Sequence, residues 1–357
     1  MFTDETHLFT LQALQPLNQT DSEPYQYGGS KDAPKKAVGM RTMQHLDRTS
    51  GIRTEVPFIS AESVVHKLRE ALWLTILRRY DFRLTDFRSP AGAVLTYLMM
   101  NGGDTNIGQM MDGVKDFDRI ADMPSRFPLL GAFGFTLGGT FFPSWTAWSF
   151  VLPFVEGLPI WHRYRDSSDP LTVPSVAKLS DCLAKAADNA SNRSITYYRH
   201  PEAMGPHYRQ KSKKERQEAS EESNPAAQII AGFQPMPHTF EYIPSGTPLA
   251  FTLQFDSAAD DLVRSTVRFA FDHWVNAQNQ VTLGSHVNRG FGLVEFNHYP
   301  PSDSFPTATL FEKWLAAHDA AMRRLLTDFA NARTVLPKDV MEHPEPLFDL
   351  INRLFAL

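Results

Sequence analysis

Residues 56–80, which read VPFISAESVVHKLREALWLTILRRY, carry the strongest local signal in the sequence. Ser60 follows a short apolar segment and is a suitable N-cap, with Ser63 three positions further on. Apolar residues then recur at the helical spacing, at Val65, Leu68, Leu72, Ile76 and Leu77. This pattern predicts an amphipathic helix over residues 62–80, with His66, Arg69 and Glu70 off its buried stripe.

A strand and a long polar stretch precede this helix. Residues 7–17 are rich in aromatic and aliphatic side chains, which predicts the strand. Residues 18–55 are polar, and a loop of this length inside a compact domain is usually functional. We therefore expect an inserted excursion, partly a β-hairpin, that becomes ordered on a ligand. Its basic residues are Lys31, Lys35, Lys36, Arg41, Arg48 and Arg53.

Helical and extended patterns alternate after the helix. We expect a weaker helix over 95–111, a helix or turn leading into a strand over 140–152, and a helix over 175–189. The turn at Pro244-Ser245-Gly246-Thr247 should join strands 239–243 and 248–255 as a hairpin. A helix over 258–278, a glycine-rich turn over 284–292, a strand over 293–297 and a helix over 310–332 complete the chain.

The order of these elements predicts an α+β fold. A strand, a helix, further strands, a second helix and a last strand make up a modified ferredoxin-like or RRM-like antiparallel sheet with helices and long inserted hairpins. We expect a single domain over residues 1–357, with insertions at 18–55 and 190–238 and a helical extension at 298–357. Such sheets often bind RNA, but a fold does not decide a function.

Composition excludes several classes of protein. The net charge of −5 and the pI of about 6.2 are not those of a strongly basic protein. RNA binding would therefore require basic residues concentrated at one place on the protein. The single cysteine, Cys182, excludes an internal disulfide framework and fits a reducing cytosol. Because no secretory signal and no membrane-length apolar run is visible, we expect a cytoplasmic protein.

Motifs for catalysis or cofactors are also missing from the sequence. We find no phosphate-binding loop, dinucleotide fingerprint, His-Glu-x-x-His motif or nucleophile elbow. The histidines at 162, 200, 207 and 238 lack ligand spacing with carboxylates. We therefore expect no catalytic residue, no metal and no cofactor.

Four segments together resemble the RAMP-type backbone subunits of class 1 CRISPR effector complexes, most closely the type IV backbone protein. They are residues 10–23, 56–69, 240–251 and 284–292. The second is similar to the family pattern Pro-aromatic-Ile-Ser-Gly-x-Ser-x-basic-Gly-x-Leu-Arg, and Arg69 matches its last position. Ala61, Val65 and His66 depart from that pattern.

The resemblance implies a protein that polymerises head to tail along guide RNA, which pairs with a target strand. It implies other subunits of the complex as partners: a guide-end-binding subunit, a large or small subunit and a helicase. Residues 193–216 match the position of the thumb hairpin, which folds over the guide in relatives. The implied RNA-binding residues are Asn18, Thr20, Ser22, Arg41, Arg48, Ser60, Ser63, His66, Lys67, Arg69, Arg193, Arg199, Arg209, Lys211, Ser285, His286, Asn288, Arg289 and Gly290.

Other interpretations of these residues stay open. Arg69 could pair with Glu62 or Glu70 on a solvated helix face, the loop at 284–292 could be an ordinary turn, and residues 193–216 could be a solvated loop. The type III relatives cut RNA with an Asp where Met40 or Arg41 stands in this sequence, so we expect no cleavage here. A RAMP-like ribonuclease and a plain scaffold subunit are the alternative functions.

Overall fold

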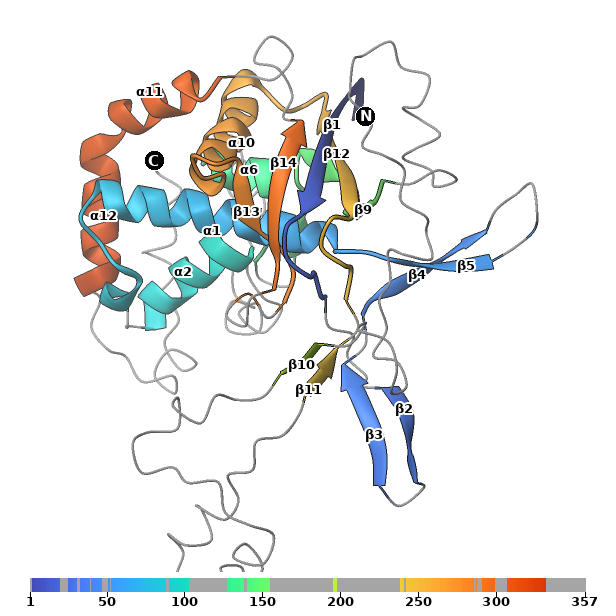
Figure 1. The fold of residues 1–357 in the computed structure, drawn as a ribbon. Helices are drawn as coiled ribbons and strands as arrows, with labels where there is room; N and C mark the ends of the chain where they lie inside the picture. The colour runs from blue at the N-terminus through green and yellow to red at the C-terminus, as the bar shows by residue number, and fades with distance from the viewer. Residues whose placement is uncertain are drawn as a thin grey trace, which may run out of the picture.

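The computed structural model describes residues 2–19, 25–30, 33–38, 40–46, 51, 53–87, 90–102, 127–137, 140–154, 195–197, 238–240, 242–285, 287, 291–298 and 307–331. These residues form a mixed structure in which helices pack against a curled antiparallel sheet (Figure 1). The prediction of an α+β fold is confirmed.

The main sheet has the strand order β13-β14-β1-β12-β8, with β9 also paired to β12. All of these pairs are antiparallel. Helix α1 (Ala61–Arg79) lies between β1 and β8 in the chain, and helix α10 (Asp261–Trp274) lies between β12 and β14. Apart from the edge strands β13 and β9, this is the ferredoxin-like βαββαβ arrangement. The strands are β1 (Phe2–Ala13), β8 (Thr146–Trp148), β9 (Leu152–Pro153), β12 (Pro248–Asp256), β13 (Gln280–Thr282) and β14 (Leu293–His298).

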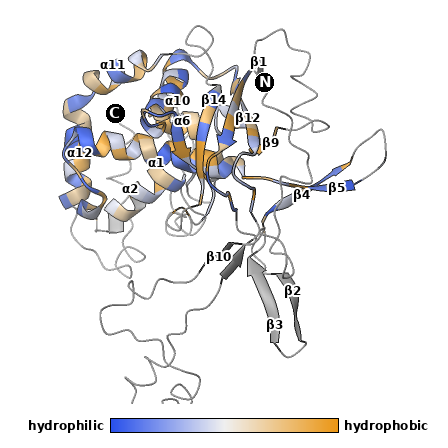
Figure 2. Ribbon diagram, in the orientation of Figure 1, coloured by the Kyte–Doolittle hydropathy of each residue, from blue (hydrophilic) through white to orange (hydrophobic). Residues whose placement is uncertain are grey.

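The hydrophobic core lies between this sheet and helices α1 and α10. Leu249, Phe251 and Phe255 of β12 belong to it because alternate residues of a strand point to the same face. The ring of Phe9 in β1 stacks on Phe251 at 4.7 Å and on Phe271 of α10 at 5.0 Å. Figure 2 shows hydrophobic residues on the central strands and on the helices that pack against them.

Helix α1 begins at the predicted N-cap. The Oγ of Ser60 accepts a hydrogen bond from the backbone N–H of Ser63 at 3.3 Å. Arg69, expected off the buried stripe, is only 4% exposed, so that part of the prediction is wrong. The reason is tertiary, since helices α2 (Pro90–Asn101) and α6 (Pro128–Phe133) pack on α1. The buried residues of α1 are Val64, Leu68, Arg69, Leu72, Trp73, Ile76 and Leu77.

The polar stretch after β1 forms two hairpins. Strands β2 (Tyr25–Ser30) and β3 (Ala33–Val38) pair with each other, as do β4 (Thr42–Leu46) and β5 (Arg53–Pro57). Strand β3 also pairs in parallel with β11 (His238–Phe240), which pairs with β10 (Ile195–Tyr197). The two predicted insertions therefore meet in one small sheet, which projects from the main sheet (Figure 1).

The predicted hairpin over residues 239–255 is wrong. The turn itself exists, since the N–H of Thr247 donates to the carbonyl of Pro244 at 3.3 Å. Its two flanking strands, however, belong to different sheets: β11 pairs with β3 and β10, whereas β12 pairs with β1. Long-range pairing therefore overrides the local turn signal.

Other elements differ from the predictions in extent. The helix predicted over 310–332 is two helices, α11 (Thr309–Ala317) and α12 (Asp319–Asn331), separated at His318. The strand predicted over 140–152 is split into β7 (Thr140–Phe142), β8 and β9, and β7 pairs with β6 (Phe135–Leu137). A short helix, η1 (Leu84–Asp86), follows α1. The helix predicted over 175–189 lies outside the described residues.

None of the helices in the described ranges is both long and apolar enough to cross a membrane.

Candidate nucleic-acid interface

The segment that leaves β1 is held by backbone hydrogen bonds on both sides. On one side, Leu17 and Ile243 exchange N–H to carbonyl bonds of 2.9 and 2.7 Å. On the other side, the N–H of Ser285 donates to the carbonyl of Asn18 at 2.6 Å, and the N–H of Gly292 donates to Pro16 at 2.9 Å. The exit of β1 therefore joins the segment before β12 to the glycine-rich loop before β14.

Glycine is required at the point where this loop meets β1. Gly284 has a φ of +78°, and a Cβ there would lie 2.4 Å from the carbonyl oxygen of Asn18. It would also lie 3.4 Å from the side chain of Ile59, which precedes helix α1. A side chain at residue 284 would push the loop away from both segments.

Gln19 connects this site to the start of helix α1. Its Oε1 accepts the backbone N–H of Ser60 at 2.6 Å, and its Nε2 donates to the Oγ of Ser60 at 2.9 Å. Its carbonyl accepts the N–H of Arg41 at 3.0 Å, and the carbonyl of Arg41 accepts the N–H of Phe58 at 3.1 Å. Three of the four segments named from the sequence thus meet around the first turn of α1, and the fourth, 240–251, is bonded to the exit of β1 at Leu17.

The first turn of α1 is accessible from solvent. Glu62 is exposed, and Ala61 and Ser63 are partly buried. The N–H of Ser63 is taken by the cap Ser60, but those of Ala61 and Glu62 have no partner within the helix, and the helix dipole makes this end positive. An anion can therefore bind here. The interface that we define around this turn consists of Asn18, Gln19, Arg41, Ser60, Ser63 and Ser285.

Five of these six residues were named from the sequence, whereas Gln19 was missed. No local pattern identifies Gln19, because its partner Ser60 lies 41 residues away. Asn18 is fully buried and Ser60 is 5% exposed, so both hold the site together rather than face solvent. Arg41, Ser63 and Ser285 are partly buried.

His66 and Lys67 lie further along α1. The Nζ of Lys67 forms an ion pair of 2.7 Å with Glu70, and both side chains are partly exposed. The Nδ1 of His66 lies 3.2 Å from the carbonyl oxygen of Met100, which orients its ring toward α2. Lys67 is partly exposed and lies one helical turn after Ser63, so its charge is near the first turn of α1.

Arg69 ties three helices together. Its guanidinium donates to the carbonyl of Phe133 at 2.7 Å and to that of Gly134, and it lies 3.5 Å from the carbonyl of Leu98. Burial lowers the pKa of Arg69 to about 9, so the group stays protonated at neutral pH. Glu62 and Glu70 do not pair with it, so the interpretation as a surface ion pair is wrong. We do not include Arg69 in the interface.

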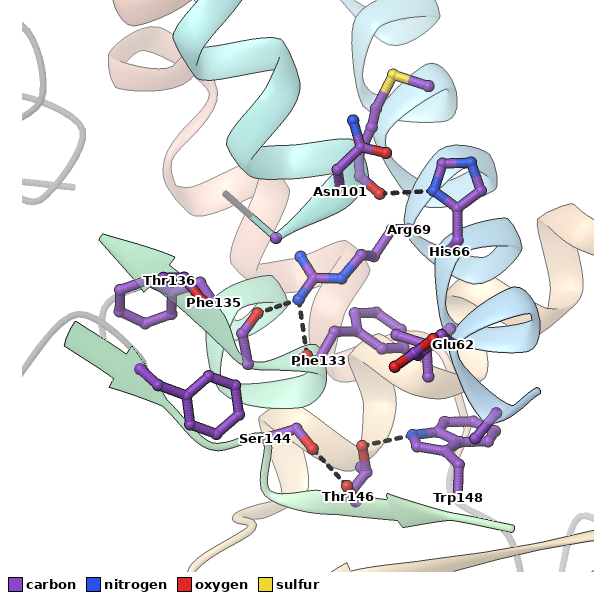
Figure 3. A pocket seen from close by; sticks show the side chains of 16 residues that line it. Glu62, His66, Arg69, Asn101, Phe133, Phe135, Thr136, Ser144, Thr146 and Trp148 are labelled. Atoms are coloured by element: carbon purple, nitrogen blue, oxygen red, sulfur yellow. Dashed lines mark hydrogen bonds between the residues drawn. The ribbon is translucent and has the colours of Figure 1, made fainter. Parts of the chain in front are cut away.

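A cavity of about 530 Å³ lies next to Arg69, between α1, the end of α2 and the strands β6–β8 (Figure 3). Its polar groups are largely bonded to one another: Trp148 Nε1 donates to Thr146 Oγ1 at 2.7 Å, and Thr146 Oγ1 donates to the carbonyl of Ala132 at 2.5 Å. At 100° per residue, Arg69 lies about 160° around α1 from Lys67. The cavity reaches the first turn of α1, since Ala61 and Glu62 also line it, but none of the six residues that define the interface does.

The remaining residues named from the sequence lie outside the described residues. They are Thr20, Ser22, Arg48, Arg193, Arg199, Arg209, Lys211, His286, Asn288, Arg289 and Gly290.

No group of three or more His, Cys, Asp or Glu side chains that could hold a metal ion is found in the described part of the chain. Met40, one of the two residues expected to stand in place of the type III Asp, is 3% exposed. Its Sδ accepts the N–H of Gln19 at 3.1 Å, so this buried side chain helps to hold Gln19 in place.

Comparisons with known proteins return a weak structural similarity. No protein-family model matches the sequence, and no curated protein matches it. A chain of a solved structure described as "Type IV-B CRISPR Complex" is similar to this chain with a TM-score of 0.43 and 13% sequence identity, over 88% of this chain and 99% of that chain.

Proposed function

We propose that this protein is a non-catalytic backbone subunit of a class 1 CRISPR effector complex, which binds guide RNA through its phosphates. The observation that supports the proposal is the convergence at the first turn of α1. Segments 10–23, 56–69 and 284–292, which resemble the family in sequence, are joined there by hydrogen bonds among Gln19, Ser60, Asn18 and Ser285. The fourth such segment, 240–251, is joined to the exit of β1 by the bonds between Leu17 and Ile243.

The chemistry of the interface suits a phosphate rather than a base edge. Helix N–H groups, hydroxyl groups and the cation of Arg41 suit an anion whatever base it carries, and Lys67, which is paired with Glu70, lies beside the interface on α1. Sequence selection would then come from pairing between the guide and its target, as in other guided systems. The acidic net charge of −5 is compatible with this role when the cations gather at one face.

The proposal includes assembly. Copies of a subunit that follows an RNA strand contact each other head to tail, and such a contact does not close into a ring. The expected assembly is a helical filament on the guide, joined by a guide-end-binding subunit, a large or small subunit and a helicase. The expected place of this assembly is the prokaryotic cytoplasm.

The decisive experiment is the binding of single-stranded RNA at several salt concentrations. We expect oligonucleotides of different sequence to bind with similar affinity, and log K to fall with log salt by about 0.7 for each phosphate neutralised. Lys67→Gln should lower this slope by about 0.7. A strong preference for one sequence, or no slope at all, would contradict the proposal.

Two further measurements separate the alternatives. Incubation of guide-paired target RNA and of repeat RNA with magnesium tests for a ribonuclease. Asp47 lies in the same polar stretch, 18–55, as Met40 and Arg41, and cutting that Asp47→Ala abolishes would replace the proposed function. Absorbance at 260 nm during purification tests for a scaffold without RNA contact. We expect RNA to co-purify, and electron microscopy of that material should show filaments.

A further inference from the structure

Two phenylalanine rings lie next to the start of helix α1. The ring centroids of Phe58 and Phe150 are 4.7 Å apart, with an angle of 35° between the planes. Phe150 is 43% exposed, and Phe58 is partly buried. An exposed pair of aromatic rings is a surface on which a flat apolar group can stack.

The backbone holds both rings in place. Ile59 and Val151 exchange two hydrogen bonds of 2.9 and 3.0 Å, and both side chains are fully buried. Neighbouring residues of extended chain point to opposite faces, so Phe58 and Phe150 turn away from the core. The Oγ of Ser149 accepts the N–H of Thr252 at 2.8 Å, which anchors the second ring to β12. The pair is therefore preformed.

The position of the pair relates it to the interface. Phe58 and Ser60 are two residues apart and share a face, which separates them by about 6.6 Å in extended chain. The N–H of Phe58 donates to the carbonyl of Arg41. Arg41 forms no ion pair with any described residue. Phe58 is thus bonded to the backbone of Arg41 and lies two residues before the N-cap of a helix start that attracts anions.

These surroundings favour a nucleobase over a protein partner. A stable protein interface buries about 800 Å² on each side around an apolar centre. The pair is small, and its neighbours Arg41, Ser60 and Ser149 are polar. A nucleotide offers a flat base beside its own phosphate, which matches rings beside an anion site.

We propose that Phe58 and Phe150 form a stacking platform for one base of the strand whose phosphate binds at the first turn of α1. This inference rests on the proposed function, because it places the base of the nucleotide whose phosphate the interface holds. It adds a contact that depends on the base being present but not on its identity.

The test compares a short single-stranded RNA with an oligonucleotide of the same length that lacks its bases, by fluorescence anisotropy with the full-length protein. Removing a stacking contact should weaken binding about 5- to 150-fold. We expect Phe150→Leu, which keeps an apolar side chain, to weaken binding of the normal RNA by this factor. Binding of the abasic strand should not change.

Phe141→Leu is the matched control. Phe141 is also exposed, at 71%, but it lies on β7 at the rim of the cavity beside Arg69. We expect this variant to bind both strands as the unmodified protein does. If Phe150→Leu weakens both strands equally, or neither, the platform is refuted while phosphate binding stands. If neither strand binds the unmodified protein, the proposed function itself fails.

Discussion

The contact between Gln19 and Ser60 provides the sharpest test of the interface. Gln19→Ala removes two hydrogen bonds, of 2.6 and 2.9 Å, that join the exit of β1 to the cap of helix α1. It also leaves the N–H of Ser60, a residue that is 5% exposed, without its acceptor. Each bond contributes about 1 kcal/mol, and a buried unpaired N–H costs about 1–3 kcal/mol. The lost bond to Oγ and the unpaired N–H together should lower the free energy of unfolding by about 2–4 kcal/mol in urea titrations.

Gln19→Glu separates stability from binding. A carboxylate can still accept the N–H and the hydroxyl proton of Ser60, and a negative charge near the start of a helix is stabilising by about 0.3–1 kcal/mol. Stability should therefore be retained, whereas RNA affinity should fall because the charge repels a phosphate at the same helix end. Anisotropy with single-stranded RNA measures this loss.

Gln44→Ala is the control for both variants. The side chain of Gln44 donates to Glu55 at 3.3 Å on the exposed β4–β5 hairpin, so its loss should change stability by less than about 0.5 kcal/mol. If Gln19→Ala lowers the free energy of unfolding no more than Gln44→Ala does, the hydrogen bonds between Gln19 and Ser60 do not stabilise the start of helix α1. If Gln19→Glu binds RNA normally, the phosphate does not lie at this end of α1.

Three further predictions concern other residues. Gly284→Ala should destabilise the protein by at least about 2 kcal/mol, because the φ of Gly284 is +78° and an added Cβ would meet the carbonyl of Asn18. Gly246→Ala is the control: its φ is +84° but no atom lies within 4 Å of the added Cβ, so it should cost only the backbone strain of about 1–2 kcal/mol. Arg69→Met should lower the free energy of unfolding by about 2–4 kcal/mol, because the buried carbonyls of Phe133 and Gly134 lose their donor. The dependence of RNA affinity on salt should not change. A slope of log K against log salt that is reduced by about 0.7 would instead place Arg69 on a phosphate. Glu62→Gln should raise RNA affinity, since it removes an exposed negative charge from the first turn of α1, and should cost about 0.3–1 kcal/mol of stability; unchanged affinity at low salt would argue against a phosphate there.

Local sequence was sufficient where an element depends on its own residues. The apolar spacing from Leu68 to Leu77 and the hydroxyl of Ser60 predicted helix α1 and its first residue, because helical periodicity and N-capping act within one or two turns. The glycine-rich loop was also visible, since a positive φ at Gly284 and Gly292 restricts the residue type. The order of strands and helices then predicted the α+β fold.

Contacts between distant segments required the folded chain. The turn at residues 244–247 indicated a hairpin, yet β12 pairs with β1, so that Phe9 lies opposite Phe251. The sequence does not distinguish Arg69 from a surface residue, because its burial depends on the packing of α2 and α6 on α1. It does not identify Gln19 either, because the partner of Gln19, Ser60, is distant in the chain. Spacing along the chain encodes which face of a helix is apolar and where it starts, but it contains no distance between residues 19 and 60. That distance is set by the packing of the whole sheet and its helices, which is why the elements were predictable and the interface they form was not.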